Sequence, residues 1–326
     1  YLSVLRRILT SMEHRSYMRG ATTTQILLVA LLFLCTIPSQ NYAETESNPE
    51  SLKVEILDST PHDHTSFTQG LELTEGRFLE SSGLYGHSRI SEIDIDSGEI
   101  VRQIWFEETI FAEGITVRDE SIIMLTWREG IAIEISLVDF NIINNYSYEG
   151  EGWGICFNGQ HLVMTNGSSD LIFRDPYTFE VNHTLRVTMG GEEVRNLNEL
   201  ECVGDTIYAN VWLEDFIIGI DSSSGKVIFS VSASEISEIQ GNSHNEVLNG
   251  IAHDESSGAF WITGKNWTEL YLVDFLPKES DRRPDTSQLS SKILPVALFV
   301  GVTLMLYRIT QSNKDPETPN FKDHRQ

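Results

Sequence analysis

Short runs of alternating or continuously apolar residues, separated by Gly, Asp, Asn and Ser, fill the chain between Leu52 and Phe275. Apolar alternation with a period of two is typical of β-strands, whereas an amphipathic helix repeats about every 3.6 residues. No stretch between these limits has a convincing helical period. The pattern therefore predicts many short strands joined by tight turns, and no helix.

Five of these runs resemble one another and recur at nearly constant spacing. Their first residues, separated by 44, 40, 46 and 50 positions, are Gln69, Glu113, Trp153, Glu199 and Asn249. A turn and a second apolar run follow each of them, at 77–81, 121–127, 161–166, 206–212 and 259–264. Repeats of roughly 45 residues with four short strands each are typical of propeller blades. The repeats predict an all-β fold, a five-bladed β-propeller over residues 52–275.

Two apolar segments lie outside this region. Ile26–Leu34 follows Arg15 and Arg19, which is the pattern of a signal peptide, and a type II membrane anchor is the alternative interpretation. The run from Ile293 to Tyr307 is about 22 Å long as a helix, short for a bilayer span of about 30 Å. The expected organisation is a leader (1–43), a lead-in (44–51), the propeller (52–275), a linker (276–292), a single transmembrane anchor (293–309) and a polar tail (310–326). This predicts a monomeric protein in the secretory lumen or outside the cell, attached as a type I membrane protein.

Composition and net charge limit the kinds of molecule that the protein is expected to bind. Of the 326 residues, 40% are hydrophobic, which is sufficient for a substantial core. The formal net charge of −25 argues against nucleic acid as a partner, because a phosphate backbone requires a basic face.

The cysteines and the glycosylation sequons are evidence about the cellular compartment of the protein. Cys35 belongs to the leader, and Cys156 and Cys202 are too few for a disulfide framework and too scattered for a zinc site. A disulfide between the latter two is possible but disfavoured, since equivalent points on adjacent blades are expected to lie too far apart. The N-x-[ST] sequons, candidates for glycosylation in a lumen, are Asn145, Asn166, Asn182 and Asn266.

Candidate chemistry is concentrated at the repeated strand starts. In a propeller these starts converge on one face, so residues about 45 positions apart become neighbours. The residues there are unusual for structural repeats: Phe67, Gln69, Phe111, Glu113, Trp153, Asn198, Glu199 and Asn249. Buried polar groups among aromatic rings cost free energy unless they are paired or used, so the set predicts a site.

Three further candidates, Trp127, Trp212 and Lys265, end second strands, and Trp267 follows closely. Packing between blades is the alternative role for these tryptophans. Lys265 is expected to stabilise an oxyanion or to pair with Glu113, and the alternative is an ordinary solvated lysine.

Glu113 is the strongest candidate for proton transfer. A carboxylate amid Phe111, Trp127 and Trp153 should be partly desolvated, which raises its pKa toward the range useful for catalysis. The alternative is a surface glutamate at a turn. By contrast, His62, Asp63 and His64 precede the first repeat without a third partner at useful spacing, and they are interpreted as a solvated lead-in rather than a metal site.

At these residues the chain resembles the glutamine cyclotransferase family of plants and bacteria. The motifs occur in family order: Phe67-Thr-Gln-Gly-Leu71, Phe111-Ala-Glu-Gly-Ile-Thr116, Leu125-Thr-Trp127, Gly152-Trp-Gly154, Asn198-Glu-Leu-Glu201, Ala209-Asn-Val-Trp212, Leu248-Asn-Gly-Ile251 and Thr263-Gly-Lys-Asn-Trp267. Asn166, where Asp is common in the family, and Thr268, where Pro is common, are departures in loops.

The resemblance implies a metal-free, cofactor-free enzyme that cyclises the N-terminal glutamine of peptides and proteins to pyroglutamate. It implies Glu113 and Lys265 as catalytic residues. The substrate-binding residues that it implies are Phe67, Gln69, Trp127, Trp153, Asn198 and Trp212. Two alternatives are a non-catalytic lumenal propeller that binds peptides or glycans, and a propeller hydrolase with calcium held by Glu113, Asn198 and Asn249.

Overall fold

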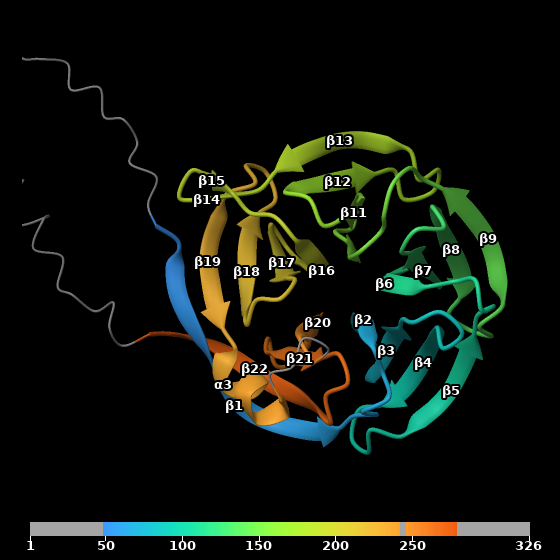
Figure 1. The fold of residues 1–326 in the computed structure, drawn as a ribbon, viewed down its shortest axis with the longest axis horizontal. Helices are drawn as coiled ribbons and strands as arrows, with labels where there is room; N and C mark the ends of the chain where they lie inside the picture. The colour runs from blue at the N-terminus through green and yellow to red at the C-terminus, as the bar shows by residue number, and fades with distance from the viewer. Residues whose placement is uncertain (1–47, 242–245, 279–326) are drawn as a thin grey trace, which may run out of the picture. The chain divides into compact units, whose positions relative to one another are not determined.

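A computed structural model describes residues 48–241 and 246–278 of the chain. Its regular secondary structure is almost entirely β-strand, with the sheets arranged around a common centre in a propeller-like fold (Figure 1). The prediction of an all-β, propeller-like protein is therefore confirmed. The expected leader, the anchor and the polar tail lie outside the described residues. Within those residues, no helix combines the length and apolar character needed to cross a bilayer.

Three antiparallel sheets have four strands each. The first contains β2 (Thr68–Thr74), β3 (Arg77–Ser82), β4 (Arg89–Asp94) and β5 (Ile100–Trp105). The second contains β6 (Ala112–Arg118), β7 (Ser121–Thr126), β8 (Ile131–Ser136) and β9 (Ile142–Ser147). The third contains β10 (Ile155–Phe157), β11 (Leu162–Met164), β12 (Asp170–Arg174) and β13 (Val181–Arg186). A small two-stranded sheet, β14 (Thr188–Met189) with β15 (Glu192–Glu193), follows them.

The remaining strands form one eight-stranded sheet. In spatial order it contains β16 (Leu197–Val203), β17 (Thr206–Val211), β18 (Phe216–Asp221), β19 (Val227–Ser232), β1 (Glu50–Pro61), β22 (Glu269–Pro277), β21 (Phe260–Gly264) and β20 (Leu248–His253). The first described strand, β1, pairs antiparallel with the last, β22, and also runs parallel to β19. The strand pairing therefore extends two residues beyond the expected limits at 52 and 275.

The second strands begin and end within a few residues of the predicted runs, because their alternation is local information. One element was not predicted: α3 (Ser234–Gln240) is a short helix between β19 and β20. The expectation of no helix was wrong here. Only Ile236 and Ser237 of this helix are buried, so its seven residues carry too little apolar periodicity to be recognised.

The innermost strands form a closed ring. Each of β2, β6, β10, β16 and β20 contacts the next one, and β20 returns to β2 (Figure 1). Glycines permit this close approach: a Cβ on Gly114 would lie 2.7 Å from the Gly154 Cα, and one on Gly154 would lie 2.0 Å from the Asn198 carbonyl oxygen. The apolar core fills the space between neighbouring sheets, as where Leu79 of β3 and Met124 of β7 share one cluster.

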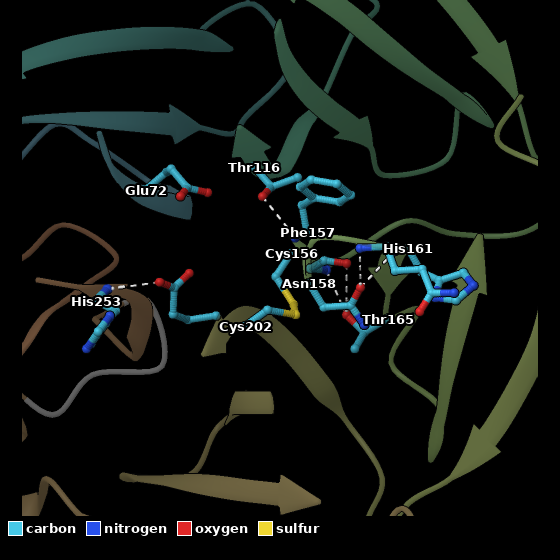
Figure 2. Close-up of a disulfide and its surroundings, with 12 residues drawn as sticks. Glu72, Thr116, Cys156, Phe157, Asn158, His161, Thr165, Cys202 and His253 are labelled. Atoms are coloured by element: carbon cyan, nitrogen blue, oxygen red, sulfur yellow. Dashed lines mark hydrogen bonds between the residues drawn. A yellow bond between two sulfur atoms is a disulfide. The ribbon is translucent and has the colours of Figure 1, made fainter. Parts of the chain in front are cut away.

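The close approach of the inner strands also corrects the expectation for the cysteines. Cys156 of β10 and Cys202 of β16 form a disulfide, with their Cα atoms 5.5 Å apart (Figure 2). Adjacent sheets diverge outward but converge at the ring, so inner positions lie within disulfide range. The bond therefore links two neighbouring sheets at the ring of inner strands.

Candidate active site

A β-bulge begins four of the inner strands at the same place. The register of pairing shifts around Gln69 in β2, Glu113 in β6, Asn198 in β16 and Asn249 in β20. A bulge adds an unpaired residue and re-aims its side chain, which is why bulges are frequent next to active sites. The same local irregularity therefore directs four polar side chains toward one end of the ring.

The bulges correct the register of the fourth repeat. Asn198, rather than Glu199, is equivalent to Glu113. Both Glu113 and Asn198 lie two residues after a residue whose carbonyl accepts the backbone N–H at the end of the next strand. These bonds join Trp127 N to Phe111 O at 3.0 Å and Trp212 N to Asn196 O at 2.9 Å. A shift of one residue changes which face a side chain occupies, so Glu199 points elsewhere.

All eight predicted site residues line one cavity of about 290 Å³. Its full lining is Phe67, Gln69, Leu84, Phe111, Glu113, Trp127, Trp153, Asn198, Trp212, Val247 and Lys265. Leu84 and Val247 were not predicted as site residues, and their apolar character offered no signal in the sequence. The cavity is large enough for one amino-acid side chain together with its backbone.

Aromatic rings form most of the wall. Trp153 and Trp212 meet edge to face with centroids 5.7 Å apart, and Phe111 lies 5.3 Å from Trp127. The three tryptophans are half-buried, as expected for rings that contact both the core and a cavity. Trp267, in contrast, is completely buried and donates its indole N–H to the Glu246 carbonyl, so the packing role applies to it.

Glu113 is a buried carboxylate with few partners. Only 5% of the residue is exposed, so it is not a surface glutamate. Burial raises the pKa of Glu113 well above its usual value, the charge of Lys265 opposes this rise, and Glu151 and Glu129 add to it. Gln69 Nε2 donates to Glu113 Oε1 at 3.2 Å. The raised pKa predicted for this carboxyl is confirmed, and its cause is the predicted one.

Lys265 is also buried, which contradicts the alternative of a solvated lysine. Burial lowers its pKa to about 8, and the negative charge of Glu113 partly counteracts that decrease. Its Nζ lies 4.7 Å from the centroid of the Phe67 ring, within cation–π range. One cavity thus holds an acid with a raised pKa and a base with a lowered pKa.

Asn249 orients the amide that contacts Glu113. Its Nδ2 donates to Thr68 O at 2.9 Å and lies 3.5 Å from Gln69 Oε1. Because Gln69 Oε1 faces the Asn249 amide donor, the Gln69 NH₂ group points to the Glu113 carboxylate. Asn249 therefore supports the cavity wall from behind, although it does not line the cavity itself.

The structure corrects the interpretation of His62 as part of a solvated lead-in. His62 is buried, with Nε2 2.9 Å from Glu80 Oε1 and Nδ1 2.8 Å from Trp267 O. Burial alone would lower the pKa of His62, but the Glu80 carboxylate raises it, and the same contact lowers the pKa of Glu80. The two side chains form an internal hydrogen bond, which is an ion pair when His62 is protonated, and His64 remains exposed.

One functional candidate was missed. Glu151 accepts the indole N–H groups of both Trp127 and Trp153, each at 3.0 Å. It lies in a loop outside the repeated positions, so nothing in the pattern distinguished it. As for cations, residues 48–241 and 246–278 contain no group of three or more His, Cys, Asp or Glu arranged to hold a metal ion. A calcium ion at Glu113 would also face the ammonium of Lys265.

Comparisons with known proteins identify relatives of this chain. The sequence profile described as glutamine cyclotransferase matches residues 27–275. A glutaminyl-peptide cyclotransferase of Arabidopsis thaliana is 31% identical over 257 residues, which cover 76% of this chain and 80% of the plant protein. The crystal structure of Myxococcus xanthus glutaminyl cyclase superimposes with a TM-score of 0.66 at 33% identity, covering 71% of this chain and all of the bacterial chain.

Proposed function

The chain belongs to the glutamine cyclotransferase family, and from this membership we propose that it converts the N-terminal glutamine of peptides and proteins to pyroglutamate with release of ammonia. The observation that carries the proposal is that buried Glu113 and buried Lys265 line the same cavity, which is walled by aromatic rings. Two ionisable groups whose environments move their pKa values toward neutrality are characteristic of acid–base catalysis.

The reaction requires one proton to move between two nitrogens. The neutral α-amine of the substrate attacks its own γ-carboxamide carbon, forming a C–N bond and a tetrahedral oxyanion. Glu113 takes the proton that the attacking nitrogen must lose and returns it to the amide nitrogen, whose C–N bond then breaks to release ammonia. The free amine has a pKa near 7.7, so a carboxylate with a raised pKa is a suitable base.

The other lining residues have supporting roles. Lys265, with Asn198, donates to the oxygen on which negative charge develops, which is most effective in a site shielded from water. Gln69 orients Glu113. The aromatic side chains of Phe67, Trp127, Trp153 and Trp212 hold the glutamine side chain in its ring-forming conformer, so that the reacting atoms are already close.

We count the scaffold as five blades. Three are the separate four-stranded sheets, and two are the halves of the eight-stranded sheet, β16–β19 and β20–β22 with β1. The support for this count is the ring of five contacting inner strands. In this arrangement the N-terminal strand supplies the outer strand of the final blade.

We also propose an oxidising, secretory location. The Cys156–Cys202 disulfide supports it, because such bonds persist outside the cytosol, and the sequons at Asn145 and Asn182 lie on exposed outer strands. The type I anchor at 293–309 rests on its sequence alone. Truncation before Ser291 should release a soluble, glycosylated monomer, and a truncated protein that stays with membranes would place the anchor elsewhere.

Ammonia release from a Gln-initiated peptide tests the function. The same peptide with an acetylated N-terminus is the matched control, since its α-nitrogen is no longer a nucleophile. We expect ammonia and a pyroglutamyl product from the free peptide only, before and after exhaustive chelator treatment. Binding without ammonia would indicate a non-catalytic propeller, and activity lost to a chelator and restored by calcium would indicate the metal-dependent alternative.

A further inference from the structure

We infer that Glu151 is a positioning residue, which holds the two indole walls of the cavity in the orientation that the cyclisation requires. Glu151 does not line the cavity, but its Oε2 accepts from Trp127 Nε1 and from Trp153 Nε1, each at 3.0 Å. The inference rests on the proposed function, because the position of these rings matters only if the cavity binds the substrate.

The geometry connects two separate parts of the scaffold. Trp127 follows β7 in one sheet, whereas Trp153 precedes β10 in the next. An indole nitrogen can only donate, so a shared carboxylate oxygen is the acceptor that both rings can use at once. Hydrogen bonds to an ionised acceptor are stronger than neutral ones, and this pair fixes each ring relative to the other.

Glu151 is held in its ionised form. Burial alone would raise its pKa, but donation from Trp153, Arg128 and Trp127 holds the pKa below its usual value. Arg128 Nε donates to Glu151 Oε1 at 3.0 Å, and its guanidinium lies over the Trp127 ring at 3.6 Å. The carboxylate therefore remains a charged acceptor at neutral pH.

The same charge acts on the catalytic carboxyl. After burial, which is the dominant cause, the negative charge of Glu151 raises the pKa of Glu113 further. Removing that charge should lower the pKa of Glu113 and move the acidic limb of the pH–rate profile to lower pH. An ordinary surface ion pair between Arg128 and Glu151 would affect neither this limb nor substrate binding.

Substitutions of Glu151 separate its hydrogen bonds to the two indoles from the effect of its charge on the pKa of Glu113. In Glu151→Gln, glutamine retains the size but has one acceptor oxygen and no charge, so we expect KM for a Gln-initiated peptide to rise roughly tenfold. The acidic limb of kcat/KM should move to lower pH. Glu151→Asp keeps the charge but reaches less far, so it should raise KM while leaving the limb in place. Glu149→Gln, the same charge change at an exposed position nearby, is the matched control and should do neither.

The indole N–H signals provide a readout that does not depend on activity. In protein with ¹⁵N-labelled tryptophan, which has six indoles, Glu151→Gln should move the signals of Trp127 and Trp153, assigned with Trp→Phe variants. Unmoved signals, or moved signals with wild-type KM and pH profile, would overturn the inference. A wild-type protein that releases no ammonia would instead remove the proposed function, and the positioning role with it.

Discussion

Two buried glutamates at neighbouring positions of equivalent bulges, Glu113 in β6 and Glu199 in β16, have different partners. Glu113 is the first residue of the bulge in β6, whereas Glu199 is the second residue of the bulge in β16, where β2, β6 and β20 have glycine. Both are buried, and burial raises the pKa of both well above the usual value. Glu113 lines the cavity, but Glu199 does not.

The partners of the two carboxylates explain what each does. Glu199 accepts the backbone N–H of Leu71 at 3.2 Å and that of Ile251 at 2.9 Å, so it bridges strands across the ring. Glu113 accepts the side-chain amide of Gln69 and faces the cavity. A raised pKa alone therefore does not identify a catalytic acid. Access of the carboxylate to a bound molecule distinguishes the two.

The largest expected difference between them is in turnover. Glu113→Gln keeps the shape of the side chain but cannot exchange a proton at neutral pH, so kcat should fall by about 10²- to 10⁴-fold. KM should change much less, since the aromatic wall remains. Steady-state kinetics with a Gln-initiated dipeptide measure both, with circular dichroism to verify folding. Near-normal turnover in a folded variant would exclude Glu113 as the base.

The scaffold also includes the disulfide, which joins β10, just after Trp153, to β16, which carries Glu199. It closes a loop of 46 residues, so the Cys156→Ala/Cys202→Ala variant should lose about 4 kcal/mol of unfolding free energy in the loop-entropy description. Urea unfolding measures this loss. Activity per folded molecule should stay close to that of the wild type, and a large decrease in kcat would show that the bond also shapes the cavity.

Glu199→Ala should lower the free energy of unfolding rather than kcat. Two buried backbone donors lose their acceptor, and each costs about 1–3 kcal/mol, so a loss of roughly 3 kcal/mol is expected. Thermal and urea unfolding provide the measurement, with kcat determined at a temperature where the variant is folded. A stable variant with a strongly reduced kcat would contradict the assignment of Glu199 to the scaffold.

The smallest expected effect is the pH dependence of rate and stability that arises from Lys265. Its pKa of about 8 means that the ammonium is lost as the pH rises through that value, so kcat/KM should decrease about tenfold per pH unit above it. Stability should change in the opposite direction. The unfolded lysine keeps its proton up to about 10.4, so the unfolded state binds more protons in this window and unfolding free energy rises with pH.

Kinetics and thermal unfolding recorded at the same pH values separate these two effects. A basic limb that coincides with a decrease in melting temperature would indicate denaturation rather than loss of the Lys265 proton. A rate that stays constant to pH 10 would show that the charge of Lys265 is not needed for turnover.

Local sequence patterns encode the strands, their repetition and most of the residues of the candidate site. Alternation is a local property, and it located the second strands at 77–81 and 206–212 within a residue of their observed ends. Repetition then identified Gln69, Glu113 and Trp153 as equivalent, and equivalent inner positions of a ring must converge. Repetition thus gathered the candidate residues at strand starts and strand ends, and the resemblance to the family selected from them the eight that line the cavity.

How those positions meet depends on contacts between strands that are distant in the sequence. The register of the fourth repeat depended on a bulge, whose extra residue places Asn198 in the cavity and Glu199 across the ring. The Cys156–Cys202 bond depended on how closely β10 and β16 approach, and the buried His62 on a contact with Glu80. Glu151 belongs to no repeat, and its role follows from two indoles that reach the same oxygen from different sheets. These features are set by distances between separate strands, which local periodicity does not encode.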